Sequence, residues 1–256
     1  MKRVILSLLA VAVVATVSAQ EKKEYPKPEG MRPGMTEFWT PQPKVVKPGD
    51  IKTNSAPSDA IVLFDGTNLS AWKSSRGGEA DWQVHDGVFT VDKSKGDIIT
   101  KQSFGSFQLH LEWCVPENIT GTSQGRGNSG VFLQDKYEIQ ILDNYNNETY
   151  ANGQAGSVYK QVIPKANAMR KPGEWNVYDI IYNAPVFNED GTYKVHPTIT
   201  LIHNGVLLLN NFVIQGTTEY IGLPRVVKHG DGPIKLQMHG DPSEPISFRN
   251  VWVRKL

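Results

Sequence analysis

Apolar and polar residues alternate in short runs from residue 60 to the C-terminus. The clearest run is FQLHLEWCV at residues 107–115, in which every second side chain is apolar. Such alternation predicts β-strands with one buried face, and no window of helical length shows a 3.6-residue apolar period. We therefore expect an all-β domain with strands at 61–64, 82–84, 88–91, 98–101, 107–115, 128–134, 137–143, 175–182, 198–203, 206–213, 234–239 and 248–254.

Turn residues separate these runs. Asp86-Gly87 and Asn204-Gly205 each lie between two apolar runs and are strong hairpin signals. The expected strands are uneven in length and spacing. This pattern favours a sandwich of two sheets over an up-and-down barrel.

The stretch GRGNSGVFLQDKYEIQILD, residues 125–143, is expected to be the organising centre of the domain. Two of the predicted strands, 128–134 and 137–143, flank a tight turn at Asp135-Lys136. The apolar residues of the second strand belong to a core, so its polar residues point to an open face.

Glu138 and Gln140 are the polar residues of that second strand. Regular alternation would place Asp143 on the opposite face, because it is an odd number of residues away from both. A bulge at Ile141-Leu142 would turn it onto the same face. Two carboxyls flanking an amide suit acid–base chemistry on a sugar. The alternative is a solvated strand whose outer face is polar without any function.

Residues 1–19 have the pattern of a signal peptide. Lys2 and Arg3 precede an apolar stretch, and small residues end at Ala19, where cleavage is expected. The stretch is short for a membrane span and no later stretch qualifies, so we expect an exported protein without a transmembrane segment, periplasmic or extracellular. Residues 20–58 are rich in proline and lysine and form an extension, and 59–256 form the β-sandwich domain.

Composition narrows the classes of function. The chain has 27 Lys and Arg against 26 Asp and Glu and no basic block, which argues against a nucleic-acid partner. Cys114 is the only cysteine, so an internal disulfide is excluded. The histidines show no metal-binding spacing, and we predict no cofactor and no catalytic metal. A structural calcium held by turn oxygens stays open. The oligomeric state cannot be derived from these patterns.

Seven motifs follow one another along the chain: FDGTNLSAW, WQVHDGVFTV, FGSFQLHLEW, NSGVFLQ, YEIQILD, EWNVYDI and the C-terminal IKLQMHGDPSEPISFRNVWVRKL. This ordered series resembles the domain-of-unknown-function 1080 family, also called the 3-keto-disaccharide hydrolase domain. The resemblance covers residues 60–256 and implies a concanavalin A-like jelly-roll sandwich. It also implies cleavage of glycosides oxidised at sugar C3, as in exported Bacteroidetes-type members.

A second resemblance lies within the first. The segment EIQILD at 138–143 is similar to the E-x-D-x-x-E strand of laminarinase-type glycosidases, with Gln140 for the central Asp and Asp143 for the last Glu. Because Gln140 carries no charge, double displacement is not expected here. A 3-keto-sugar offers another route, since the ketone acidifies the C2 hydrogen and the C1 substituent then leaves by β-elimination.

This chemistry assigns roles to candidate residues. Glu138 is predicted to be the base, Asp143 the acid or an orienting group, and His239, at a strand end, the donor to the enolate. Gln140 and Asn128 are expected to bind sugar hydroxyls. Further candidates for substrate contacts are Arg126, Lys101, Tyr159, Lys160 and Trp72, each of which could instead have a structural or surface role.

Three functions follow from these observations. The first is an exported enzyme that cleaves a 3-keto-glycoside, with an oxidised sugar as its partner. The second is a lectin-like module that binds carbohydrate on the same fold without chemistry. The third is a structural or partner-binding domain of the cell envelope, which the proline-rich extension favours. The carboxylates distinguish the enzyme from the lectin, because only the enzyme needs one with a raised pKa.

Overall fold

The computed structural model describes residues 30, 32, 35, 37 and 41–256. The chain divides into two units, Met1–Val45 and Val46–Leu256, and all described strands lie in the second. The predicted signal peptide and much of the extension lie outside the described residues. Within the described part, no helix has the length and apolar character needed to cross a membrane.

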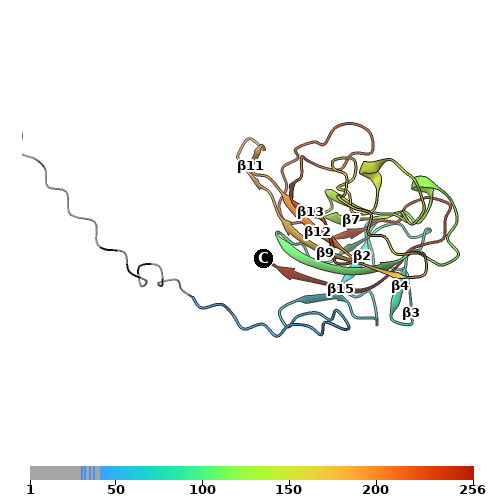
Figure 1. The fold of residues 1–256 in the computed structure, drawn as a ribbon, viewed down its shortest axis with the longest axis horizontal. Coiled ribbons are helices and arrows are strands. Elements are labelled where there is room, and N and C mark those ends of the chain that lie inside the picture. Colours follow the sequence, from blue (N-terminus) through green and yellow to red (C-terminus); the bar gives the residue numbers. More distant parts are fainter. Residues whose placement is uncertain (1–29, 31, 33–34, 36, 38–40) are drawn as a thin grey trace, which may run out of the picture. The chain divides into compact units, whose positions relative to one another are not determined.

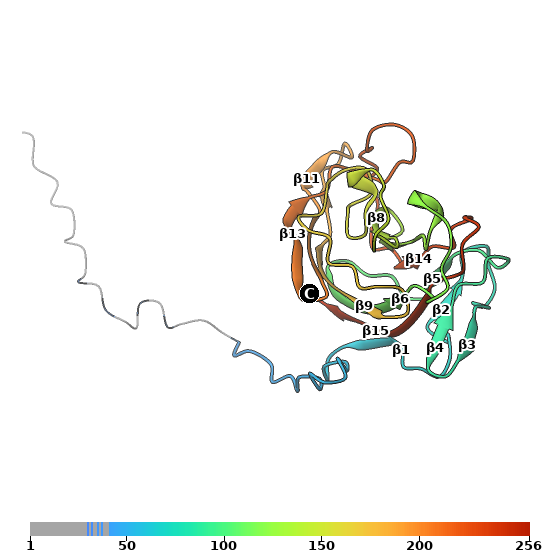
Figure 2. The same cartoon turned by 45° about the vertical axis from the view of Figure 1, so that its right-hand side comes forward.

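The larger sheet contains eight strands. Its long central strands, β6 (Phe107–Cys114) and β15 (Ser247–Lys255), pair antiparallel. Figure 2 shows this sheet curving around the second one. In spatial order the remaining members are β13 (Val206–Val213), β12 (Thr198–His203) and β9 (Trp175–Asn183) before β6, then β4 (Val88–Thr90) and β3 (Gln83–His85) after β15, with β1 (Ile61–Phe64) also paired to β15.

The smaller sheet has five strands, of which β2 and β7 are labelled in Figure 1. Its order is β2 (Trp72–Ser74), β5 (Ile98–Thr100), β14 (Lys235–Leu236), β7 (Ser129–Leu133) and β8 (Tyr137–Ile141). A separate hairpin joins β10 (Val186–Phe187) and β11 (Tyr193–Val195), and two 3₁₀ turns are η2 (Ser123–Gly125) and η3 (Ala151–Gly153). The expected all-β, two-sheet jelly-roll sandwich is confirmed.

The core lies between the two sheets and is rich in aromatic residues. Trp113 and Tyr178 come from the larger sheet, and Trp72 and Tyr137 come from the smaller one; all four are fully buried. The indole of Trp72 donates to the carbonyl of Leu63 at 2.8 Å, which satisfies its polar atom inside the core.

The central hairpin differs from the expected one in its turn and its end. Leu133 pairs with Tyr137, so the loop has three residues and not two. Gln134 and Asp135 both have positive φ, at 51° and 56°, a backbone that closes such a loop. β8 ends at Ile141 and pairs with β7 without a register shift. The bulge expected at Ile141-Leu142 is therefore not formed.

The polar face of β8 is covered, contrary to the open face that alternation predicted. Glu138 and Gln140 are both buried. Residues 156–159 run along the outer edge of the strand, where Tyr159 N donates to Glu138 O and Gln140 N donates to Ser157 O, both at 3.0 Å. On the same strand, the backbone N–H of Glu138 donates to Thr218 Oγ1 at 2.9 Å. Loops therefore turn this face into the floor of a pocket.

Candidate active site

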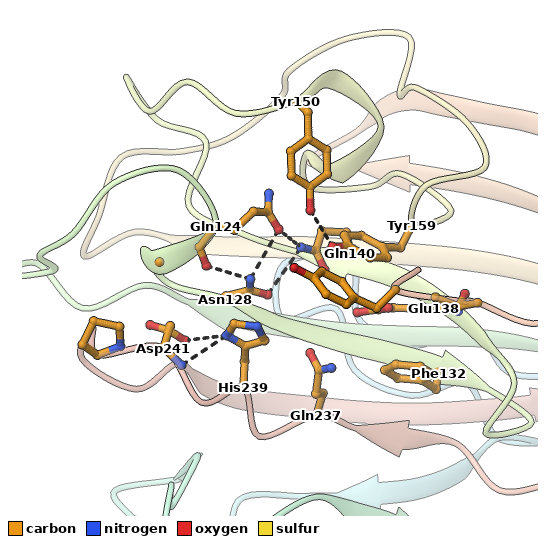
Figure 3. Close-up of a pocket in the computed structure, with 14 residues that line it drawn as sticks. Gln124, Asn128, Phe132, Glu138, Gln140, Tyr150, Tyr159, Gln237, His239 and Asp241 are labelled. Carbon is orange, nitrogen blue, oxygen red and sulfur yellow. Dashed lines mark hydrogen bonds and ion pairs between the residues drawn. The ribbon is translucent and has the colours of Figure 1, made fainter. Parts of the chain in front are cut away.

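A pocket of about 630 Å³ lies over β7 and β8 (Figure 3). Its volume is in the range of sites for small ligands. Strand side chains form the floor, and loops from four parts of the chain form the walls. The lining residues are Gln124, Gly125, Asn128, Phe132, Glu138, Gln140, Tyr150, Tyr159, Thr218, Tyr220, Gln237, His239, Asp241 and Pro242.

Glu138 is the one glutamate of the pocket lining, and its side chain is nearly removed from solvent. The residue is 5% exposed. Gly130 on β7 makes room for it, because a Cβ at that position would lie 2.6 Å from Glu138 Oε1. Within the described residues, the Glu138 carboxyl has no ion-pair partner and no hydrogen-bond donor. Rotating the Gln140 amide by 180° would place its nitrogen 3.3 Å from Glu138 Oε1.

Burial raises the pKa of Glu138 to about 8. The cation of Lys235 acts in the opposite direction, and the carboxylate of Asp97 adds to the increase. Lys235 does not pair with Glu138, because its ammonium lies 2.7 Å from Asp135 Oδ1 and 3.9 Å from the centre of the Phe132 ring. A carboxyl with a pKa near neutrality can both accept and return a proton.

Amide side chains surround the sugar-sized space beside Glu138. Gln140 Nε2 donates to Gln124 Oε1 at 3.0 Å, and Asn128 Nδ2 donates to Gln124 O at 2.8 Å. Gln237 Oε1 is buried and has no hydrogen-bond partner within the described residues. Neutral amides that both donate and accept hydrogen bonds are suited to binding hydroxyl and carbonyl groups.

His239 forms the other titratable side of the pocket. Its Nδ1 lies 3.0 Å from Asp241 Oδ2, while the backbone N–H of Asp241 lies 3.3 Å from the same nitrogen. Both contacts cannot be hydrogen bonds for one tautomer, and the shorter, charge-assisted bond to the carboxylate favours a proton on Nδ1. Nε2 is then the ring nitrogen free to exchange a proton with a ligand.

Asp241 is buried and held from several sides. Its Oδ1 accepts from Ser243 Oγ and lies 3.4 Å from the ammonium of Lys93. Burial acts to raise the pKa of Asp241, but hydrogen bonds from His239 and Ser243 outweigh it and leave the pKa below its usual value. Asp241 therefore stays ionised and fixes the orientation of the imidazole.

Tyr150, Tyr159 and Tyr220 form the wall that faces the amides, and we call them the tyrosine wall. The hydroxyls of Tyr150 and Tyr159 are 2.5 Å apart. Lys160 lies behind these rings, with Nζ 4.5 Å from the centre of the Tyr220 ring and 2.7 Å from the Tyr220 carbonyl. Lys160 thus contacts the wall but does not line the pocket.

Five of the ten predicted site residues line the pocket: Glu138, Gln140, Asn128, Tyr159 and His239. Lys160 contacts the wall. Trp72 lies in the core, where its indole is already paired. Lys101 forms an exposed ion pair with Glu79 at 2.7 Å, away from the pocket lining.

Asp143 and Arg126 pair with each other and not with the pocket. Arg126 Nε lies 2.7 Å from Asp143 Oδ2, and the Asp143 side chain is completely buried. Burial raises the pKa of Asp143, while the Tyr145 N–H and Arg126 act to lower it. Because β8 ends at Ile141, Asp143 is not in line with Glu138 and Gln140.

Gln237 and Asp241 were not among the predicted site residues, although the alternation of the chain before them was a usable signal. Lys235, Gln237 and His239 alternate along KLQMH, so they share one side of an extended chain. Lys235 pairs with Phe132, which in turn pairs with Glu138 on β8, and this register places the side chains on the site. No local pattern marks the loop residues Gln124, Tyr150, Thr218 and Tyr220.

The described residues contain no group of three or more His, Cys, Asp or Glu side chains arranged to hold a metal ion. The pocket lining offers one glutamate, one aspartate that is already paired, and one histidine. The structural calcium remains an open prediction.

Comparisons with known proteins give a consistent picture. A 3-keto-disaccharide hydrolase of Bacteroides thetaiotaomicron aligns over the full length of both chains with 28% identity. A crystal structure from Parabacteroides distasonis, described as a candidate glycosyl hydrolase, has 66% identity and a TM-score of 0.87, covering 90% of this chain and 99% of the other. A second structure of that description and organism has 25% identity and a TM-score of 0.54, covering 77% and 99%.

Residues 59–254 match the family described as the 3-keto-alpha-glucoside-1,2-lyase-like domain. The match spans nearly all of the sandwich and confirms the resemblance drawn from the motifs. Together with the relatives it also confirms the expectation of an enzyme of the glycoside-cleaving type. The chain belongs to the family of 3-keto-alpha-glucoside-1,2-lyase-like domains.

Proposed function

We propose that this protein is exported and cleaves the glycosidic bond of 3-keto-α-glucosides by elimination followed by hydration. The observation that carries the proposal is the Glu138 carboxyl, which is buried, has no ion-pair partner among the described residues, and has a pKa of about 8. It lies at the floor of a pocket whose amides suit a sugar. The family match supports the oxidised substrate and the α-linkage.

The ketone determines what the enzyme must supply. A carbonyl at C3 makes the hydrogen at C2 acidic, because the resulting anion is delocalised onto the carbonyl oxygen. The substituent at C1 is β to that carbonyl and can then leave. The reaction needs a base at C2, donors at the enolate oxygen and an acid at the leaving oxygen.

The geometry of an α-glucoside separates base and acid. The C2 hydrogen and the C1 oxygen are both axial, on opposite faces of the ring, so elimination requires groups on both sides of the sugar. Glu138 and His239 both line the pocket and lie apart in the view of Figure 3, so a sugar bound between them would have one group on each side. We assign Glu138 as the base and His239 as the acid.

The proton balance closes with these two groups. Glu138 takes the C2 proton, a C1–C2 double bond forms, and the C1–O bond breaks as the imidazolium of His239 gives its Nε2 proton to the leaving oxygen. Neutral His239 then accepts a proton from water as the oxygen of that water bonds to C1. While the aglycone leaves and water enters, the proton on Glu138 exchanges with solvent; Glu138 then gives a proton to C2, and the net reaction is hydrolysis.

The amides supply the donors for the enolate. Gln140, Asn128 and Gln237 are neutral, and their NH₂ groups can donate to an oxygen on which charge develops without competing for the C2 proton. Asp241 acts through His239 as a positioning residue. Asp143, paired with Arg126 behind the pocket, keeps only the orienting role that the sequence offered as one alternative.

The test is an assay of the purified protein on a 3-keto-α-glucoside with a chromogenic aglycone, beside the unoxidised glucoside. We expect release from the keto form only, and loss of release in Glu138→Gln. Release from both forms would show a conventional glycosidase and contradict the proposal. Binding of the keto-sugar without release would assign the protein to the lectin-like class.

A further inference from the structure

The two walls of the pocket differ in chemistry. The amide wall, formed by Gln124, Asn128 and Gln140, presents donors and acceptors. The tyrosine wall presents ring faces and edges. A substrate with one polar half and one apolar half would fit such a pocket better than a uniformly polar one.

The loop of residues 216–225 continues the tyrosine wall outwards, and its base is firmly held. Thr217 N donates to Arg225 O at 2.9 Å. The guanidinium of Arg225 contacts Glu219 Oε1 at 2.9 Å. A Cβ at Gly216 would lie 2.6 Å from Arg225 O, so the two ends of the loop are in close contact. Such a closed base presents the tip in a defined place.

The same loop is attached to the floor of the pocket beside Glu138. Thr218 Oγ1 accepts from Glu138 N at 2.9 Å, and Thr218 N donates to Lys136 O at 2.9 Å. Two residues further on, the Tyr220 carbonyl accepts from Lys160 Nζ. The loop therefore leads from Glu138 to the rim of the pocket along a path that these hydrogen bonds fix.

The tip of this loop, residues 220–223, is exposed and apolar. Tyr220 is 71% exposed although it lines the pocket, and Ile221 and Leu223 are 83% and 85% exposed. Gly222 between them has φ +109°, which permits the tight tip. Ile221 and Leu223 follow the pocket residue Tyr220 directly in the chain, so the exposed apolar tip begins at the pocket and offers a surface that an apolar group of a ligand can cover.

We propose that the tip and the tyrosine wall together form a subsite for an aromatic aglycone, the leaving half of the substrate. This inference rests on the proposed function, which places the sugar against the amides and Glu138. The aglycone must then extend from C1 towards the rim, where Tyr220 is continuous with Ile221 and Leu223. The preferred substrates are therefore 3-keto-α-glucosides of aromatic alcohols.

A second sugar fits this rim less well than an aromatic ring. Tyrosine rings also stack on sugars, but Ile221 and Leu223 cannot hydrogen-bond to hydroxyl groups, and covering them with a hydroxyl-rich surface leaves those hydroxyls without partners. An aromatic group loses no hydrogen bonds on the same surface and gains the burial of apolar area.

The test compares two unoxidised ligands, naphthyl α-glucoside and methyl α-glucoside, by calorimetric titration into the full protein. We expect the naphthyl compound to bind about tenfold tighter, as one well-covered apolar side chain at the rim is enough for that ratio. The double substitution Ile221→Ser with Leu223→Ser should reduce the ratio to about twofold.

The matched control removes two apolar side chains from another exposed place. Val206 and Leu207, on β13 at the edge of the larger sheet, are each 42% exposed and do not line the pocket. Val206→Ser with Leu207→Ser should keep the wild-type ratio. The inference would be overturned if the wild type bound the two ligands with equal affinity or bound neither. It would also be overturned if the affinity ratio fell equally in both double variants.

Turnover of methyl 3-keto-α-glucoside, measured separately, tests the proposed function. Turnover without a preference for the naphthyl ligand would retain the function and overturn the aromatic subsite. Preference for the naphthyl ligand without any turnover would overturn the function and retain a binding site for aromatic glycosides.

Discussion

Two glutamates in this sandwich are buried to the same degree but have opposite properties. Glu112 on β6 is 4% exposed and Glu138 on β8 is 5% exposed. The pKa of Glu112 falls to about 2, and the pKa of Glu138 rises to about 8. Loss of solvent acts to raise both values, so the partners of each carboxyl must account for the difference.

Glu112 is surrounded by donors. Arg249 Nε lies 2.6 Å from Oε2, and Asn250 Nδ2 lies 2.9 Å from Oε1. His110 Nε2 lies 3.6 Å from Oε1. These hydrogen bonds and the charge of Arg249 outweigh the burial and keep the carboxylate ionised. Both oxygens of the Glu112 carboxylate are occupied by donors, so the role of this residue is structural.

Glu138 lacks such partners among the described residues. Lys235 is close enough to lower its pKa but is held by Asp135 and Phe132. Burial alone therefore does not identify a reactive carboxyl in this fold. A reactive group is one whose partners are engaged elsewhere, so that its proton remains available to a ligand.

The largest expected difference between Glu138 and Glu112 is in the effect of their substitution on kcat. Glu138→Gln should lower kcat by about 10³-fold, in the range that a general base contributes, because the amide cannot accept the C2 proton. Glu112→Gln should leave kcat within about twofold, since its side chain lies outside the pocket lining. Steady-state kinetics on the keto-glucoside check both. A similar loss of kcat in the two variants would show that the loss comes from replacing a buried carboxyl and not from removing the catalytic base.

Stability should show the reverse order. Glu112→Gln at neutral pH should cost about 1–3 kcal/mol in the free energy of unfolding, because Arg249 loses its carboxylate partner. The pKa of Glu112 is lower in the folded state, so its contribution is present above about pH 4.5 and is lost as the pH falls towards about 2. Urea unfolding at a series of pH values measures this. A variant as stable as the wild type at neutral pH would refute a structural role.

Glu138→Gln should instead stabilise the protein at alkaline pH. The folded pKa of Glu138 is raised, so its contribution to stability is complete below about pH 4.5 and is lost as the pH rises through about 8. The advantage of the variant should grow by at most about 1.4 kcal/mol per pH unit across that window and then level off. Thermal unfolding between these limits provides the measurement, and a difference that does not change with pH would contradict the raised pKa.

The smallest expected effect is a pair of opposite shifts in the pH–rate profile. On a substrate whose aglycone leaves without protonation, so that the acid His239 is not required, wild-type kcat/KM should rise with pH and level off above about 8, because the base must be ionised. Lys235→Met removes the cation that lowers this pKa and should move the limb to higher pH. Asp97→Asn removes the anion that raises it and should move the limb to lower pH.

At neutral pH these two variants should change kcat/KM by about threefold in opposite directions, the effect of roughly half a pKa unit. Each serves as the control for the other, since both alter a charge beside the site. Shifts of the same sign would show that Glu138 is not the group that titrates.

Much of the fold could be predicted from the sequence because alternation is a local property. The long strands β6, β9 and β15 correspond to the runs that alternate most clearly. Glu138 and Gln140 could be found for the same reason, since the parity of a single strand places them opposite its apolar residues. His239 could be found from its position at the end of an expected strand.

The rest of the site depends on contacts that no local pattern encodes. Tyr220 and Gln124 come from loops, and only tertiary structure brings them to β8. The prediction for Asp143 required an irregularity in β8, but the strand ends at Ile141 and the carboxylate pairs with Arg126. Trp72 shows a different limit, because the same aromatic side chain suits a core and a sugar platform equally well.

The most direct test of the central claim follows the C2 hydrogen itself. The purified protein is given a 3-keto-α-glucoside in D₂O, and the 3-keto-glucose released in the first turnovers is analysed for deuterium at C2, against the uncatalysed exchange of the same product. The account predicts deuterium well above that background in the wild type and none above it in Glu138→Gln. Product that keeps protium at C2, together with an unchanged kcat/KM when C2 of the substrate carries deuterium, would show that the bond is cleaved without removal of this hydrogen, and would contradict Glu138 as the base.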